Sequence, residues 1–312
     1  MISLVISWLN FFLAILLLPP LILSLIRKTK ARLQNRVGPS WFQPIYDWSK
    51  LCRKDETLSS TLTWIFRGSA ALNFILVLLL ALFLPWISFK PSFTGDDIFL
   101  AIYVLALARF FSLLASLDSG SAFGGFAASR EATLSLLVEP AFMLALVALG
   151  INARSSSLSA IFSYSTDANN QVVCFLAGTG ILLSSLVELS RMPIDDPTTH
   201  LELTMVHEAM ILEASGRNLL LVEVSYALKM TVLLGLSAQC FIHALQANIV
   251  CPKLLLVILS YLGILGLAAL VGLIEGLTVK LHWRKDPEFI AYALTMSLLA
   301  CFISIGQGAT FK

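Results

Sequence analysis

Eight runs of apolar residues, each about 20 residues or longer, constrain this chain more than any other feature. A helix of about 20 apolar residues spans the ~30 Å hydrocarbon core of a bilayer. Only 13% of the residues are charged, whereas a soluble domain carries about 25%, so a soluble fold would lack polar surface. The sequence therefore predicts an all-α integral membrane protein with about eight transmembrane helices, at residues 3–26, 68–88, 97–117, 130–151, 172–190, 217–246, 253–279 and 288–306.

The distribution of Lys and Arg predicts how this single membrane domain, residues 1–312, is oriented. Fifteen of the 21 basic residues lie in four polar segments, 27–67, 118–130, 191–217 and 280–287. Because cytoplasmic loops carry an excess of Lys and Arg, these segments are expected to be cytoplasmic. Both termini are then outside, and two long cytoplasmic docking loops remain, 27–67 and 191–216. The first run is too long for a signal-peptide core and ends in a basic cluster, so we expect a retained helix.

The cysteines give no sign of a metal site. The five are scattered and form no CxxC or other ligand spacing, and they stand at Cys52, Cys174, Cys240, Cys251 and Cys301. Such thiols are usually buried or interfacial. We therefore expect this chain to hold no zinc and no iron–sulfur cluster of its own.

Six charged residues stand in or at the edge of the apolar runs: Arg109, Glu139, Glu188, Glu223, Lys229 and Glu275. Each charge costs about 2.5–3.5 kcal/mol at the centre of a membrane helix. They must therefore pair, become neutral or line water. Pairing alone is one interpretation, for example Arg109 with a carboxylate or Glu223 with Lys229. Acids outnumber bases four to two, so the favoured interpretation is a hydrated chain of acids that passes protons.

A Gly/Ser-rich stretch from Asp118 to Glu131 is predicted to be a loop that enters the helix at 130–151. Arg130 and Glu131 then start this helix, and Glu139 follows eight residues later. With 3.6 residues per turn, Glu131 and Glu139 lie within about 80° of each other. This arrangement suits proton transfer, and a helix cap plus one buried acid is the alternative.

The acidic segment 191–216 is the second candidate. Pro193 and Pro197 are expected to end the preceding helix, and Thr198 or Thr199 could cap a short helix that runs to Glu213. Three side chains would share one face of it, with Glu208 beside them: His200, Thr204 and His207. No HExxH motif is present, so a mobile acidic segment against the basic first loop or a partner subunit is favoured over a metal site.

Three motifs together resemble a known family across nearly the whole chain. RLQNRVGPSWFQPIYDWSKLCRKDE resembles the first cytoplasmic loop of the complex I membrane subunit that forms the quinone chamber. ARFFSLLASLDSGSAFGGFAASREATLSLLVEP is similar to the equivalent subunit of formate hydrogenlyase and other group 4 [NiFe] hydrogenases. ELSRMPIDDPTTHLELTMVHEAMILEASG resembles the energy-converting hydrogenase branch. Complex I members have further acids where this chain has Thr198 and His200, which favours the hydrogenase side.

The resemblance implies a membrane anchor and ion-coupling subunit of an energy-converting [NiFe] hydrogenase, in the cytoplasmic membrane of a prokaryote. Its implied partners are hydrogenase-like large and small subunits, which carry the NiFe centre and a [4Fe–4S] cluster, and antiporter-like membrane subunits. This chain would bind no cofactor and no nucleic acid, and the redox chemistry would occur in the partner chains.

The predicted functional residues fall into two sets. The resemblance implies that Glu139, Glu188, Glu202 and Glu213 line an acidic path. The Gly/Ser-rich stretch adds Glu131 to this path, and the membrane charges add Glu223, Lys229 and Glu275. It places Arg36, Asp195 and Asp196 near the junction with the soluble arm. The predicted docking or coupling set is completed by Arg130, Arg191, His200, His207 and Glu208.

Two other functions remain open. The first is the quinone-chamber subunit of a complex I-like NADH/quinone oxidoreductase, with quinone entering beside the first helix. The second is a standalone secondary ion transporter, for which helices broken at Pro19–Pro20 and Pro193–Pro197 would be compatible.

Overall fold

The computed structural model describes residues 2–59, 62–89, 91, 96–163, 168–195, 205–245 and 252–310. Eight of its helices are long and apolar enough to cross a membrane, which confirms the all-α membrane prediction. The elements are α1 (Ile2–Leu33), α2 (Gln43–Cys52), α3 (Trp64–Phe83), α4 (Ile98–Asp118), α5 (Ala122–Ala153), α6 (Leu158–Ser163), α7 (Ala168–Glu188), α8 (His207–Met210), α9 (Gly216–Leu245), α10 (Lys253–Leu277), η1 (Trp283–Lys285) and α11 (Asp286–Thr310).

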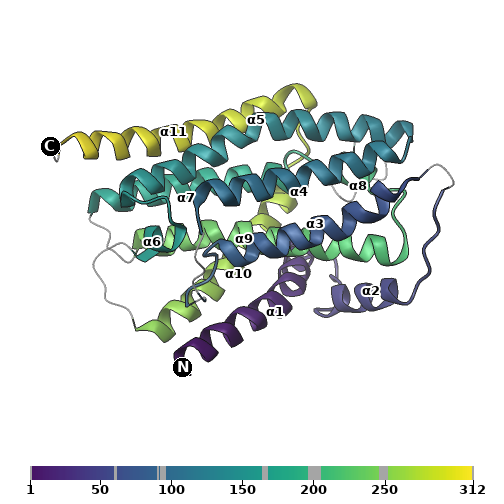
Figure 1. The fold of residues 1–312 in the computed structure, drawn as a ribbon, viewed down its shortest axis with the longest axis horizontal. Coiled ribbons are helices and arrows are strands. Elements are labelled where there is room, and N and C mark those ends of the chain that lie inside the picture. The colour runs from purple at the N-terminus through teal and green to yellow at the C-terminus, as the bar shows by residue number, and fades with distance from the viewer. Residues whose placement is uncertain are drawn as a thin grey trace.

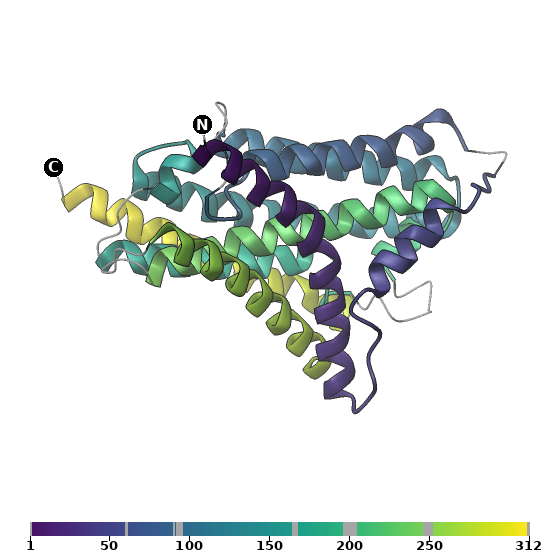
Figure 2. The same cartoon turned by 90° about the horizontal axis from the view of Figure 1, so that it is seen from below.

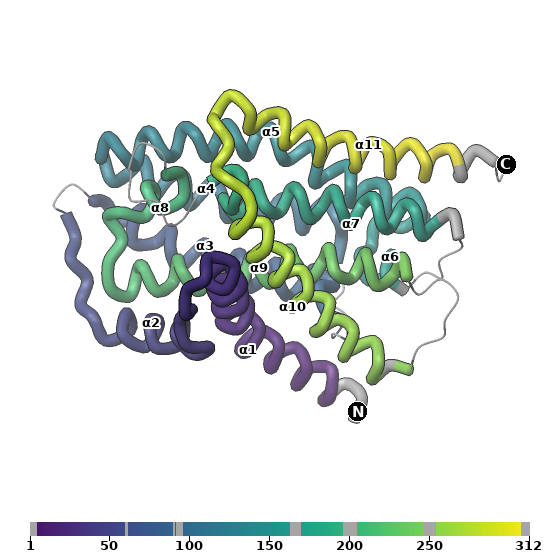
Figure 3. Tube along the Cα trace, turned by 180° about the vertical axis from the view of Figure 1, so that it is seen from behind, coloured from purple at the N-terminus to yellow at the C-terminus, as the bar shows by residue number. Residues whose placement is uncertain are grey.

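Six of the long helices, α3, α4, α5, α7, α9 and α11, run side by side, as Figure 1 shows. The other two, α1 and α10, pack on each other and on α9, and they lean away from the six (Figure 2). The short helices α2 and α8 lie at one end of the bundle, which we call the loop end (Figure 3). Both chain termini lie toward the opposite end, called here the termini end.

The first helix is longer than the sequence predicted. α1 is helical through Pro19 and Pro20, as the predicted run 3–26 requires, and it continues to Leu33, so it lacks the break that would be compatible with the transporter alternative. Proline is tolerated in membrane helices because neighbouring helices and side chains compensate for the lost hydrogen bonds. The segment 27–67 is also less of a loop than predicted, since it contains the end of α1 and the whole of α2.

The helix predicted to start at residue 130 starts eight residues earlier, at Ala122. Ser121 caps it, because its hydroxyl accepts a hydrogen bond from the Gly124 backbone N–H at 3.0 Å. A Cβ atom on Gly124 would lie 2.9 Å from the Ser116 carbonyl oxygen, so this glycine permits the close turn between α4 and α5. Glu131 therefore lies about 2.5 turns inside α5 instead of at its start.

The described part of the acidic segment contains only one short helix, α8, and not the continuous helix predicted as far as Glu213. Thr198 and Thr199, the predicted caps, lie outside the described residues. The segment does contact the first loop, as Thr57 N–H donates to the Ser215 hydroxyl at 2.9 Å and that hydroxyl donates to the Thr57 carbonyl at 2.8 Å.

The half of the bundle toward the termini end is packed with apolar side chains. Five of them, at most 5% exposed, come from four helices: Leu105, Leu146, Ile181, Leu233 and Leu236. This apolar half lies beyond the membrane charges on each of α4, α5, α7 and α9. The buried polar groups described below thus belong to the loop-end half.

Gly235 allows α9 to touch the segment after α3, and we predict that valine there destabilises the protein. A Cβ atom on Gly235 would lie 2.7 Å from the Trp86 carbonyl oxygen and 2.9 Å from the Trp86 Cβ. Overpacking of this kind costs about 1–3 kcal/mol. The thermal unfolding midpoint in detergent should fall for Gly235→Val and stay nearly unchanged for Gly266→Val, since no atom lies within 4 Å of a Cβ atom on Gly266. Equal shifts would contradict the explanation.

Candidate functional site

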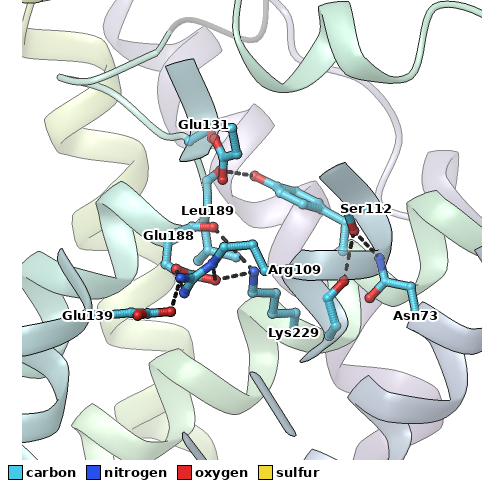
Figure 4. A network of polar contacts seen from close by, with 11 residues as sticks. Asn73, Arg109, Ser112, Glu131, Glu139, Glu188, Leu189 and Lys229 are labelled. Carbon is cyan, nitrogen blue, oxygen red and sulfur yellow. Dashed lines mark hydrogen bonds and ion pairs between the residues drawn. The ribbon is translucent and has the colours of Figure 1, made fainter. Parts of the chain in front are cut away.

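Four charged side chains from four different helices meet in the middle of the bundle (Figure 4). Arg109 of α4 forms ion pairs with Glu139 of α5 and Glu188 of α7. Its Nε atom lies 3.3 Å from Glu188 Oε1. Lys229 of α9 donates to the same Glu188 oxygen. We call these four residues the charge cluster, and Glu188 is its shared member.

The charge cluster explains how charges are tolerated at this depth. Arg109 is 7% exposed and Glu188 is 8% exposed, and buried ions are stable only when they are paired and hydrogen-bonded. Two cations face two carboxylates, so pairing accounts for these four residues. The pairing of Glu223 with Lys229 that the sequence suggested is wrong, because Lys229 contacts Glu188 instead.

Glu139 differs from the other members because its side chain is 37% exposed. It lies on an outward face of α5 with three other exposed residues at helical spacing, Leu136, Pro140 and Met143. A partly exposed carboxylate in an apolar span is costly against lipid. The charge cluster therefore reaches the surface of this chain within the membrane.

A central cavity of about 80 Å³ lies beside the charge cluster. It is bordered by α3, α4, α8 and α9, and its lining includes Arg109, Glu188 and Lys229. Glu131, 8% exposed, lines it as well. A cavity of this size has room for water, which these polar side chains could bind. Glu131 accepts a hydrogen bond from the Ser190 hydroxyl at 3.2 Å, which joins α5 to the residues that follow α7.

A larger side cavity of about 400 Å³ lies between α1, α2, α9 and α10. Seven charged side chains line it: Arg27, Lys30, Asp47, Arg191, Glu208, Glu223 and Glu275. The predicted acids Glu223 and Glu275 therefore face this cavity rather than the charge cluster. Polar side chains that line the two cavities therefore extend from the loop end to the middle of the bundle.

Arg191 and Glu275 form a second buried ion pair. Arg191 Nη1 lies 2.9 Å from Glu275 Oε1, and Arg191 Nε donates to the Tyr226 hydroxyl at 2.6 Å. Burial opposes the charge on Arg191, but Tyr226 and Glu275 outweigh it and raise its pKa. Arg191, which was predicted for the docking or coupling set, is 8% exposed, so it anchors the segment after α7 from inside the chain.

Asp195, which the resemblance places near the junction with the soluble arm, is also internal. It is 1% exposed, and its carboxylate lies 2.6 Å from Lys280 Nζ. The other carboxylate oxygen accepts backbone hydrogen bonds from Val206 at 2.9 Å and His207 at 3.3 Å. Asp195 thus fixes the start of α8. Sequence reasoning missed Lys280, which is 85 residues away and has no distinctive pattern around it.

His207 lies where the two cavities meet. Its ring stacks on Tyr226 with 4.8 Å between centroids, and both residues line both cavities. Burial, together with the charges of Lys229 and Arg191, lowers the pKa of His207 to about 4, although the charge of Asp195 opposes this shift. The next residue, Glu208, has a raised pKa because of burial and the nearby Asp195.

We predict that acidification loosens the segment around α8. Above about pH 6.5 His207 is neutral whether α8 is docked or displaced, so it adds no pH dependence. Between about pH 6.5 and 4 a displaced His207 binds a proton that the docked one does not, which favours displacement. Hydrogen exchange of residues 205–215, corrected for its intrinsic pH dependence, should be faster at about pH 5 than at pH 7.5.

His207→Phe is the matched control for this prediction, because phenylalanine keeps the ring contact and cannot titrate. It should remove the faster exchange at low pH. Glu208 works in the opposite direction, since its raised pKa favours the docked form on acidification. An unchanged pH dependence in His207→Phe would contradict the role of His207.

The remaining predicted residues do not join this arrangement. Arg36 and Glu213 are exposed, and Arg130 lies over the rings of Phe126 at 4.0 Å and Trp283 at 5.2 Å. Three further predicted residues lie outside the described residues: Asp196, His200 and Glu202. Across the described ranges, no group of three His, Cys, Asp or Glu side chains is placed to hold a metal ion.

Comparison with known proteins identifies the family of this arrangement. The sequence matches the NADH dehydrogenase family over residues 6–305. The chain belongs to this family. Hydrogenase-4 component C of Escherichia coli (strain K12) is 32% identical over 263 residues, which are 82% of this chain and 82% of that protein. Formate hydrogenlyase subunit 4 of the same organism is 30% identical over 226 residues, 72% of this chain and 73% of that protein.

A solved structure shares the fold of this NADH dehydrogenase family member. A chain of the membrane-bound sulfane sulfur reductase, an archaeal respiratory membrane complex, superimposes with a TM-score of 0.75 at 16% sequence identity. The match covers 97% of this chain and 98% of that chain. The resemblance to complex I and group 4 hydrogenase membrane subunits is therefore confirmed, together with the multi-pass membrane character.

Proposed function

We propose that this chain is the membrane anchor and ion-coupling subunit of an energy-converting [NiFe] hydrogenase complex. It would link electron transfer in a soluble arm to the translocation of protons or sodium ions across the membrane. The observation that carries the proposal is the position of Glu188. It is shared by Arg109 and Lys229 inside the membrane, and it directly precedes the segment that leads to the loop end.

The coupling would depend on the segment from Ser190 to Gly216. Two ion pairs hold it to distant parts of the chain, Arg191 with Glu275 and Asp195 with Lys280. A soluble arm bound at the loop end could shift this segment between two positions. Because Ser190 and Arg191 follow Glu188 within three residues, such a shift would change the contacts of Glu188 with Arg109 and Lys229.

The cofactors and partners follow from this role. The NiFe centre and the [4Fe–4S] cluster would reside in the large and small subunits of the arm, and antiporter-like subunits would lie in the membrane. The partly exposed Glu139 on α5 supports a membrane partner on that face. The loop end would face the cytoplasm, as the excess of Lys and Arg in its segments favours.

The proposal is tested by purifying the tagged chain in a mild detergent from its native membrane, then identifying the bound proteins and metals. A hydrogenase-like large subunit with nickel and iron is the expected result. Iron without nickel, together with an NADH-oxidising module, would reject the hydrogenase assignment. Recovery of a stable lone chain that carries ions would instead support the standalone transporter.

The side cavity favours a quinone-chamber subunit as the second candidate. Its volume of about 400 Å³ lies in the range of small-molecule sites, and it adjoins α1 and α2, where quinone entry was predicted. With seven charged residues, the lining of the side cavity is more polar than that of most small-molecule sites. Extraction of a stoichiometric quinone from the purified complex, displaced when Glu223→Phe fills the cavity, would support this function over the hydrogenase.

A further inference from the structure

A thin wall separates the central cavity from the side cavity. Among the described residues, the two cavities share five lining residues, His207, Ile211, Ala214, Val222 and Tyr226. Three of these are apolar, and the other two stack their rings at an angle of 29°. The aliphatic side chains and the stacked ring faces offer water no hydrogen-bond partner, which leaves the edge of the His207 ring as the polar part of this stack, and water needs two or more polar partners to occupy a buried position.

The hydroxyl of Tyr226 does not point freely into either cavity. It donates to the Leu189 carbonyl at 2.8 Å and accepts from Arg191 Nε at 2.6 Å. The backbone N–H of His207 is bound to Asp195. Helix α10, through the Arg191–Glu275 pair, and the segment around Lys280, through its pair with Asp195, therefore hold the stack in place.

Ser190 provides one polar contact across this wall. It lines the side cavity, and its hydroxyl donates to Glu131 Oε2 at 3.2 Å, while Glu131 lines the central cavity. Ser190 is 3% exposed and Glu131 is 8% exposed. A serine hydroxyl is both a donor and an acceptor, so it can receive one proton as it gives up another.

We propose that protons pass between the two cavities through the Ser190 hydroxyl, while the His207–Tyr226 stack keeps water from passing. In the step, the Ser190 O–H bond breaks as its proton forms a new O–H bond on the Glu131 carboxylate. The Ser190 oxygen simultaneously takes a proton from a hydronium ion in the side cavity, which becomes water. Rotation of the Ser190 hydroxyl then points its O–H bond toward Glu131 again. The inference rests on the proposed ion-coupling function and assigns Ser190 as a proton-relay residue for it.

The water barrier is tested without measuring ion transport. Asn218, 5% exposed, lines the central cavity, so Asn218→Cys reports on access to it. The assembled complex in membrane vesicles is treated from the loop-end side with methanethiosulfonate ethylammonium, and labelling is followed by peptide mass spectrometry. The exposed Cys52 serves as an internal reference for reagent delivery. Labelling of Asn218→Cys should be slow in the otherwise unchanged complex. It should be at least about tenfold faster when His207→Ala is added, and it should stay slow when His207→Phe is added instead.

The proton relay is tested in the same complex, reconstituted in liposomes with a pH-sensitive dye. Ser190→Ala should lower proton translocation by about tenfold or more. Ser225→Ala is the matched control, because Ser225 lines the central cavity but its hydroxyl donates to the Val222 carbonyl. The double variant Ser190→Ala/His207→Ala should recover much of the lost rate, because water would then cross the opened wall.

The outcomes separate this inference from the proposed function. Fast labelling at position 218 in the parent complex, or labelling unaffected by His207→Ala, would overturn the water barrier. Normal translocation in Ser190→Ala, or no recovery in the double variant, would overturn the relay. A parent complex that moves no ions would reject the coupling function itself, and the labelling pattern would still report on the barrier.

Discussion

Glu188→Gln is expected to abolish ion translocation while electron transfer in the soluble arm continues. Glutamine has nearly the same shape but carries no charge and cannot release a proton. Arg109 and Lys229, which both contact Glu188, would then lose the carboxylate that they share, although Arg109 would keep its ion pair with Glu139. We expect a loss of translocation of at least about tenfold, which corresponds to about 1.4 kcal/mol in the barrier. Ion translocation, followed with a dye, and electron transfer should be measured in parallel on the same complex in liposomes.

The control for this change is Glu288→Gln, which makes the same substitution at an exposed position near the start of α11. It should leave both activities as they are. If Glu188→Gln translocates ions at the parent rate, Glu188 is not in the path. If both activities fall together and the complex no longer assembles, the charge cluster is needed for stability, and Glu188→Asp then tests whether a carboxylate restores coupling.

Arg191→Leu is expected to cause the largest loss of stability. The substitution leaves Glu275, which is 4% exposed, with only Lys30 Nζ at 4.0 Å, and it removes a donor to Tyr226. Removing one partner of a buried ion pair costs about 3–5 kcal/mol because an uncompensated charge remains. The thermal unfolding midpoint of the purified complex and its yield should both fall.

A double-mutant cycle distinguishes this explanation from a loss of packing. Arg191→Leu/Glu275→Leu removes both charges and should be more stable than Arg191→Leu alone, because replacing a buried pair by apolar groups is often neutral. A double variant as unstable as the sum of the two single variants would show that the pair contributes no coupling. The surface pair Arg27–Asp47, at 3.7 Å and about half exposed, should contribute at most about 1 kcal/mol when broken.

The helix number could be predicted from the sequence because the length of an apolar run is set by bilayer thickness. The need to pair Arg109 could also be predicted, since an isolated charge in a membrane helix is too costly. Which carboxylate each cation would pair with could not be predicted. Lys229 lies six residues from Glu223 on α9 but pairs with Glu188 on α7, because helix packing decides which side chains face each other.

Another prediction was wrong because polar residues were taken to indicate an exposed loop. The polar segment 118–131 suggested a loop, yet most of it is the start of α5, because Ser121 caps the helix and glycines permit close approach to α4. Arg191 and Asp195 were predicted to belong to a docking or coupling set, and the structure shows each of them bound to a residue more than 80 positions away. Such contacts leave no local signal in the sequence.

The apolar half of the bundle has a consequence for how a complex of this kind can be built. A newly inserted chain must wait in the membrane for its partner subunits, and a continuous polar route through it would let ions leak and discharge the cell's electrochemical gradient. Leu146, Ile181 and Leu236, each 0% exposed, separate the charge cluster from the termini end. Under the proposed function, this apolar half would keep ions from crossing the unassembled subunit, and an ion at Glu139 would move toward a neighbouring subunit.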